Sequence, residues 1–221
     1  MHNIINYIDR VLFSCIVIQK VMAIHVIAFN TSPKKRGNTY HLLVKLKETL
    51  ELEGIDTEIL HIGGKPLRGC NGCMKCFENR DEKCIFEDDI VNECIQKMKA
   101  ADGIVIGTPT HFADLTPVAK ALIDRSGYVS IANDRMFSRK AGAAVVAVRR
   151  AGAIHAYDSI NHFFGISNMI TVGSTYWNIG IGLEPGDVEK DDEGMATMEN
   201  LGKNMAWLLQ CMEGNEKKMS K

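Results

Sequence analysis

Four of the chain's seven cysteines fall within fifteen residues, at gaps of two, two and seven residues: Cys70, Cys73, Cys76 and Cys84. Thiolates at such short spacing on a tightly wound loop suit a cluster that offers each sulfur its own iron. Gly69 and Gly72 permit the positive backbone angles that this loop requires, and they leave amides free to face sulfur. The spacing therefore predicts an iron–sulfur cluster.

Three other interpretations of the cysteines remain open. Structural zinc usually takes two cysteine pairs separated by a longer span, so three consecutive close cysteines suit it poorly. A disulfide framework fits neither the odd cysteine count nor the cytosolic character of the remaining sequence. The cysteines can also persist as free thiols. The pattern is not that of a bacterial ferredoxin, which has a proline after its last cysteine where this chain has Ile85.

Length and composition describe an ordinary globular chain of 221 residues, with 46% apolar and 24% charged residues. The net charge of -1 predicts no bulk attraction to nucleic acid or to an anionic membrane. We expect a cytoplasmic protein. Residues 1–21 form an N-terminal extension that can fold as an amphipathic helix, without the cleavage site of a secretory signal. The domain itself is expected over residues 22–221, with a Cys-rich insertion at about 63–84.

From residue 23 onward, short apolar strands alternate with amphipathic helices. Strands are expected at about 24–29, 56–61, 103–107, 142–148 and 169–172. Helices are expected at about 38–53, 88–101, 117–125, 153–164 and 195–212. This order predicts an α/β fold, a doubly wound sheet of five parallel strands with helices on both faces. Loops at the carboxyl ends of such strands build the ligand site.

Three of these loops carry polar or cationic residues. Residues 30–39 combine hydroxyls, amides and cations just before a helix, a setting that holds phosphate. This loop lacks the glycine patterns of dinucleotide and triphosphate sites, which favours a monophosphate. Residues 108–112 and 149–153 follow the third and fourth strands. Singly, each loop also fits a solvated turn, and His111 a surface histidine; together at one sheet edge they predict a mononucleotide site.

These segments resemble the flavodoxin-like NAD(P)H-dependent FMN reductase superfamily, and within it the iron–sulfur flavoproteins. The resemblance runs from about residue 22 to residue 209. It rests on residues 32–39, the four cysteines, Asp88-Asp89, and residues 101–109, 120–125, 150–152 and 180–194. Two departures stand out: Thr31 replaces a common glycine, and the gap before Cys84 is slightly longer than the commonest version.

The resemblance implies a site for FMN and a set of cluster ligands. The phosphate would be bound by Ser32, Lys34, Asn38 and Thr39. The isoalloxazine would lie along Pro109, Thr110, His111 and Phe112, and its far side would be closed by Arg150, Ala151 and Gly152. The iron–sulfur cluster, of the 4Fe-4S type, would be held by Cys70, Cys73, Cys76 and Cys84.

The expected function is a flavin-dependent oxidoreductase that passes electrons between the cluster, FMN and either NAD(P)H or a ferredoxin-like donor. The acceptor would be a small molecule such as quinone or flavin, and the assembly a homodimer or homotetramer, without nucleic acid or membrane partners. No side chain is assigned as a catalytic acid or base, because helix capping explains Asp88 and Asp89 with fewer assumptions. The alternatives are a cluster-free NAD(P)H-dependent FMN or quinone reductase, and a non-enzymatic electron carrier or redox sensor.

Overall fold

The computed structural model describes residues 24–219, so the expected N-terminal extension lies outside the described residues. A parallel sheet forms the centre, with strand order β2-β1-β3-β4-β5 and a short β6 that also pairs with β4. This arrangement confirms the predicted α/β fold. The strands are β1 His25–Asn30, β2 Asp56–His61, β3 Gly103–Pro109, β4 Ala141–Val148, β5 Ile170–Thr171 and β6 Ile179–Ile181.

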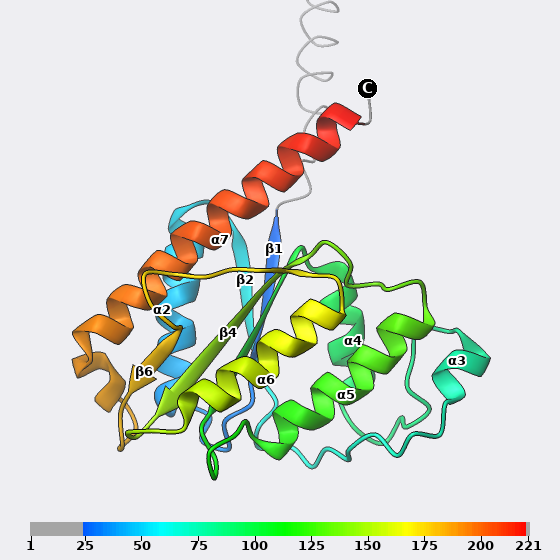
Figure 1. Cartoon of the computed structure of the whole chain (residues 1–221), viewed down its shortest axis with the longest axis horizontal. Helices are drawn as coiled ribbons and strands as arrows, with labels where there is room; N and C mark the ends of the chain where they lie inside the picture. The colour runs from blue at the N-terminus through cyan, green and yellow to red at the C-terminus, as the bar shows by residue number, and fades with distance from the viewer. Residues whose placement is uncertain (1–23, 220–221) are drawn as a thin grey trace, which may run out of the picture.

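Helices cover both faces of the sheet (Figure 1). They are α2 Asn38–Leu52, α3 Lys75–Asn79, α4 Val91–Ala100, α5 Pro117–Ala132, α6 Ala153–Ile166, α7 Asp192–Met219 and a 3-10 turn at Asp187–Lys190. Helices α2 and α7 pack on one face, and α4, α5 and α6 pack on the other. Among residues 24–219, no helix has both the length and the apolar character needed to span a membrane.

The central strands are apolar on both sides, which is why they sit in the interior of the sheet. Every residue of β4 is buried. Along this strand, Ala143 and Val145 face α2 and α7, whereas Ala144 and Val146 face the opposite helical layer. Small residues allow close helix packing: a Cβ at Gly107 in β3 would lie 2.7 Å from a methyl carbon of a leucine in α2. Two hydrophobic cores therefore hold the strand ends in fixed positions.

The predicted fifth strand at 169–172 contains β5, but the strand is split and its second part, β6, was not predicted. Its first part, β5, pairs with the start of β4 at Ala141 and Gly142. The second part, β6, pairs with the end of β4 from Val146 to Val148. Between them the chain leaves the sheet, and the hydroxyl of Ser174 donates to the side chain of Asn178 at 2.6 Å. As a result, the loop after β6 emerges at the same sheet edge as the loops after β1, β3 and β4.

Candidate functional site

A pocket of about 190 Å³ lies at the carboxyl ends of β1, β3, β4 and β6. Seven of the eleven predicted flavin-site residues line it: Ser32, Lys34, Asn38, Thr39, Pro109, Thr110 and His111. The structure thus brings the loops after the first and third strands together. The remaining four, Phe112, Arg150, Ala151 and Gly152, lie outside its lining.

The loop after β1 presents an uncapped helix end to this pocket. Helix α2 begins at Asn38, its N-cap is Gly37, and no side chain caps it. The unpaired amides of a helix start, together with the helix dipole, attract an anion. Two contacts shape the loop: the Asn30 side chain accepts from the Ser32 amide at 3.1 Å, and the Ser32 hydroxyl accepts from the Lys34 amide at 3.2 Å.

The end of β2 supports this loop from behind. The His61 ring nitrogen Nε2 lies 2.8 Å from the carbonyl oxygen of Ser32, the geometry of a hydrogen bond donated by the ring. Two residues further on, a Cβ at Gly63 would lie only 2.0 Å from the same oxygen. A glycine is therefore required at this close approach of two chain segments. The loop is fixed in place by the segment that leads into the cysteines.

Thr31, the residue that departs from the family pattern, has a structural role. Its hydroxyl donates to the carbonyl of Gly107 at 2.8 Å, and the Thr116 hydroxyl lies 3.2 Å from that of Thr31. Thr31 does not adopt a positive φ angle, so the backbone here needs no glycine. The hydroxyl instead ties the end of β1 to the end of β3, beside the pocket.

Two threonine hydroxyls in the pocket lack partners. The Oγ1 atoms of Thr39 and Thr110 are buried and form no hydrogen bond within the described residues. Both residues line the pocket. A buried polar group without a partner costs about 1–3 kcal/mol, so such groups usually meet a ligand or water. The donor set fits a ligand that carries hydrogen-bonding groups, as FMN does.

Sequence reasoning missed the residues contributed by the loop after β6. Gly182, Leu183 and Pro185 line the pocket, as does Arg149 after β4. The side-chain carbonyl of Asn38 accepts from the amide of Gly186 at 2.9 Å, which ties this loop to α2. The cluster of glycines and a proline after the fifth strand was the available signal. This segment contributed to the family resemblance, but it was not assigned to the site because β6 was not expected.

The four predicted residues outside the pocket belong to two adjoining turns. Phe112 and Ala113 have positive φ angles of 45° and 70° at the tip of a tight turn, and the Phe112 side chain is fully exposed. Gly152, with φ of 89°, packs behind this turn: a Cβ there would lie 3.1 Å from the Cα of Ala113. Arg150 and Ala151 are exposed beside it. These residues therefore frame the turn and do not face the pocket.

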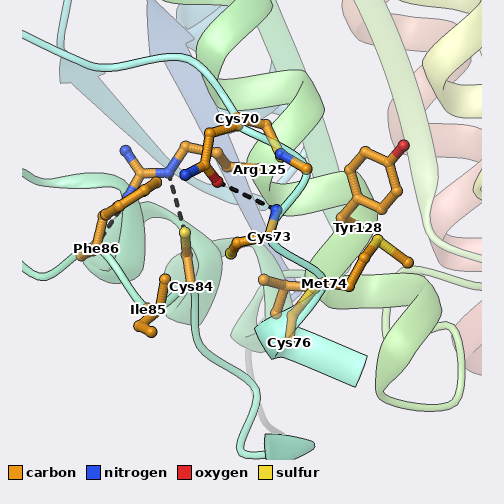
Figure 2. Close-up of a pocket in the computed structure, with 12 residues that line it drawn as sticks. Cys70, Cys73, Met74, Cys76, Cys84, Ile85, Phe86, Arg125 and Tyr128 are labelled. Atoms are coloured by element: carbon orange, nitrogen blue, oxygen red, sulfur yellow. Dashed lines mark hydrogen bonds between the residues drawn. The ribbon is translucent and has the colours of Figure 1, made fainter. Parts of the chain in front are cut away.

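The four clustered cysteines line a second, much smaller pocket of about 20 Å³, shown in Figure 2. It shares no lining residue with the first pocket. The chain around it adopts several left-handed conformations, with positive φ angles at Gly72, Met74, Arg80 and Glu82. Only glycine adopts this conformation without cost, so the three other residues must be held there by their surroundings.

Contacts from α4 and from the end of α5 hold the cysteine loop. The Arg80 guanidinium donates to the carbonyl of Ala132 at 3.0 Å, and the amide of Glu82 donates to the side chain of Asn133 at 3.2 Å. Asn92 in α4 pairs with the backbone of Cys84 in both directions, at 2.8 and 2.9 Å. These contacts tie the loop to α4 and to the residues that follow α5.

Arg125 is the most deeply buried cation among the residues around the cysteines, and its side chain is 0% exposed. Its Nε donates to the sulfur of Cys84 at 3.3 Å (Figure 2). The same guanidinium contacts the carboxylate of Asp89, whose side chain is 5% exposed. Burial is the largest influence on the pKa of Asp89 and raises it, but the hydrogen bonds from Arg125 and the Val91 amide, together with the charge of Arg125, outweigh burial and lower this pKa overall.

The two aspartates read as helix caps have wider roles. Helix α4 begins at Val91, slightly later than expected, and the Asp89 carboxylate accepts from the Val91 amide at 3.0 Å. Ile90 holds the N-cap position, so Asp89 satisfies the first helical amide from one residue before the cap, and it also binds Arg125. Asp88 instead forms an ion pair with Arg68 at 2.9 Å.

Within residues 24–219, no three His, Cys, Asp or Glu side chains converge tightly enough to hold a single metal ion. Burial is the main cause of the raised pKa of Cys76. Cys73 is exposed, while Cys70, Cys76 and Cys84 are half-buried. The four thiols therefore line one pocket within the described residues without forming a site for a single metal ion.

Known proteins with similar sequences include a flavin-reductase family and several iron–sulfur flavoproteins. Residues 24–184 match the model of the NADPH-dependent FMN reductase family. An iron–sulfur flavoprotein of Methanocaldococcus jannaschii is 36% identical over 193 residues, which cover 85% of this chain and 98% of that protein. Another, from Methanosarcina thermophila, is 30% identical over 190 residues, which cover 85% of this chain and 96% of the relative.

The fold has a counterpart among solved structures. A WrbA-like flavodoxin from Agrobacterium tumefaciens aligns with a TM-score of 0.58 and 14% identity, and the alignment covers 85% of this chain and 98% of that one. This likeness confirms the flavodoxin-like fold. The chain therefore belongs to the NADPH-dependent FMN reductase family and is a flavin-dependent oxidoreductase similar to the iron–sulfur flavoproteins.

Proposed function

We propose that FMN binds in the pocket at the carboxyl ends of the strands, with its phosphate at the start of α2. The observation that carries this proposal is the pair of unpartnered hydroxyls, on Thr39 and Thr110, in a pocket that also presents an uncapped helix end. When bound there, FMN supplies hydride or single-electron transfer.

The chain's own residues would bind and orient this ligand. The hydroxyls of Ser32 and Thr39 and the cation of Lys34 surround the helix end, where a phosphate dianion is favoured. On the other side, Pro109, Thr110 and His111 offer backbone and side-chain groups along the ring. The side-chain oxygen of Asn38 already accepts a hydrogen bond from the Gly186 amide. Asn38 would therefore contact the phosphate through its side-chain nitrogen or its backbone amide.

Four residues of the expected site take a different place in the proposal. Phe112 is fully exposed at its turn, and Arg150, Ala151 and Gly152 lie next to that turn. We assign them to the rim, where Arg149 supplies a cation that faces the pocket. In this proposal the residues of the pocket bind and orient the flavin, and none of them is assigned a proton-transfer role.

We further propose that Cys70, Cys73, Cys76 and Cys84 hold an iron–sulfur cluster of the 4Fe-4S type. The support is the shared pocket, the loop that is prearranged by α4 and α5, and the buried cation beside one sulfur. The relatives from Methanocaldococcus jannaschii and Methanosarcina thermophila are also iron–sulfur flavoproteins by name. Bound there, the cluster would exchange single electrons.

The electron donor would be NAD(P)H or a ferredoxin-like carrier, and the acceptor a small molecule such as quinone or flavin. We propose a homodimer or homotetramer in which the cysteine loop of one copy approaches the flavin of another. This is supported by the separation of the two pockets within one chain. It is also supported by exposed apolar side chains at the cysteine pocket, on Met74, Ile85 and Tyr128.

The test is anaerobic purification followed by measurement of flavin, iron and acid-labile sulfide per chain, with light scattering for the assembly. We expect one FMN and four irons per chain, and an oligomer. Yellow protein without iron would leave a cluster-free reductase, and protein that does not bind FMN would overturn the proposal. Steady-state oxidation of NAD(P)H with quinone, compared with reduction by ferredoxin, then separates an enzyme from an electron carrier.

A further inference from the structure

We propose that Arg125 sets the reduction potential of the cluster through its contact with Cys84, which makes it a positioning and tuning residue. This inference rests on the proposed function, because it requires a cluster on the four cysteines. It assigns a role to a buried cation that flavin binding and cysteine ligation do not use. Arg125 lies in α5, 41 residues away from Cys84 in sequence.

The orientation of Arg125 is fixed by acceptors on every side of its guanidinium. One terminal nitrogen binds the Asp89 carboxylate and lies 3.3 Å from the carbonyl of Arg68; the other donates to the carbonyl of Phe86 at 3.0 Å. These contacts leave Nε to face Cys84 at 3.3 Å. Because the side chain is fully buried, no solvent competes for this donor. The hydrogen bond to sulfur is therefore imposed by the fold.

Electrostatics gives the direction of the effect. One-electron reduction adds a negative charge to the cluster and its thiolates, and the electron comes from the reduced flavin, or from dithionite in a titration. A hydrogen bond and a positive charge at a ligand sulfur stabilise the more negative, reduced state. Arg125 therefore raises the reduction potential. The Asp89 carboxylate opposes this effect, because it offsets the charge of the same guanidinium.

Substitutions of Arg125 and of Asp89 should therefore shift the reduction potential in opposite directions. In Arg125→Gln the sulfur loses a charged donor, and the ratio of reduced to oxidised cluster at the wild-type midpoint should fall about tenfold. For a one-electron couple this equals about 59 mV toward negative potential. In Asp89→Asn the guanidinium keeps its contacts with the carbonyls of Arg68 and Phe86 but is no longer neutralised by a carboxylate, so the potential should rise.

Arg68→Gln is the matched control. The Arg68 guanidinium lies 4.6 Å from the centre of the Phe86 ring and that of Arg125 lies 5.5 Å from it, so both variants remove a cation next to one side chain. The Arg68 side chain, however, is 53% exposed and forms an ion pair with Asp88. Solvent screens its charge, and the change in the reduced-to-oxidised ratio should stay below twofold.

The experiment is a potentiometric titration with dithionite, followed by the electron paramagnetic resonance signal of the reduced cluster, on anaerobically purified full-length protein. Opposite shifts for Arg125→Gln and Asp89→Asn, with little change for Arg68→Gln, support the inference. Shifts of the same sign, or none, overturn it while leaving the proposed cluster intact. If Arg125→Gln does not retain its cluster, Arg125→Lys is titrated in its place, and it should shift the potential in the negative direction.

Two further outcomes are decisive. Loss of the cluster from Arg125→Lys, Arg125→Gln and Asp89→Asn alike would show that the pair only supports the fold, and would overturn the tuning role. A wild-type protein that contains FMN but neither iron nor sulfide would overturn the proposed cluster, and this inference with it. Iron and sulfide analysis of the wild type therefore separates the two failures.

Discussion

Replacing Thr39 with valine should affect stability and flavin binding in opposite directions. The hydroxyl of Thr39 is buried without a partner in the described residues, and its residue is 1% exposed. Valine keeps the branched shape and a similar helix propensity while removing the polar atom. The flavin-free protein should therefore gain about 1 kcal/mol of unfolding free energy, since an unsatisfied buried hydroxyl costs about that much or more.

The same substitution should weaken FMN binding. If the hydroxyl donates to the phosphate, its loss removes a charge-assisted hydrogen bond of about 1.5–3 kcal/mol. At 1.4 kcal/mol for each factor of ten, the dissociation constant should rise roughly tenfold to hundredfold. Riboflavin, which lacks the phosphate, should bind the variant and the wild type about equally.

Both effects are measured on flavin-free protein, by urea unfolding and by titration of flavin fluorescence. Thr116→Val is the control for the stability measurement. The Thr116 hydroxyl is also buried, but it caps α5 by accepting from the amide of Ala119 at 3.2 Å. Its loss should cost about 1 kcal/mol. A destabilised Thr39→Val protein, or one with unchanged affinity for FMN, would refute the assignment of this hydroxyl to the ligand.

Three further predictions follow from other parts of the molecule. Gly63→Ala should displace the loop after β1, to which we assign the phosphate of FMN, by about 1.4 Å, because its Cβ would lie 2.0 Å from the Ser32 carbonyl oxygen and ordinary contact begins at 3.4 Å. Fluorescence titration should show FMN binding weakened more than tenfold in this variant and unchanged in Gly165→Ala, which has open space around it. Burial raises the pKa of Cys94 to about 12, so this thiol should not react with iodoacetamide in native protein at pH 8, as measured by mass spectrometry. Modification as fast as in urea would contradict the burial of Cys94. Hydrogen bonds from lysines, chiefly Lys203, lower the pKa of Glu199 to about 2. The contribution of Glu199 to stability is therefore full above its unfolded pKa and is lost as the pH falls toward 2; NMR titration should show the pKa rise in Lys203→Met.

The local pattern of the sequence was enough to predict the fold. Apolar strands that alternate with amphipathic helices along the chain can be recognised within windows of about six to fifteen residues, because each type of element has its own hydrophobic periodicity. The expected strand at 56–61 matches β2, and the alternation of elements correctly predicted the parallel sheet. The split of the last strand was not predictable in this way. It arises because β4 offers pairing groups at both ends while polar residues between β5 and β6 leave the sheet.

The two candidate sites were predictable to different degrees. Loops that follow consecutive parallel strands meet at one edge by topology alone, and so the grouping of Ser32, Thr39 and Thr110 followed from their order in the chain. The grouping of the four cysteines was predictable from their spacing in the sequence. The contact between Arg125 and Cys84 was not, because it joins segments 41 residues apart. Only the packing of α5 against the cysteine loop decides which buried cation faces which sulfur, and sequence periodicity carries no record of that pairing.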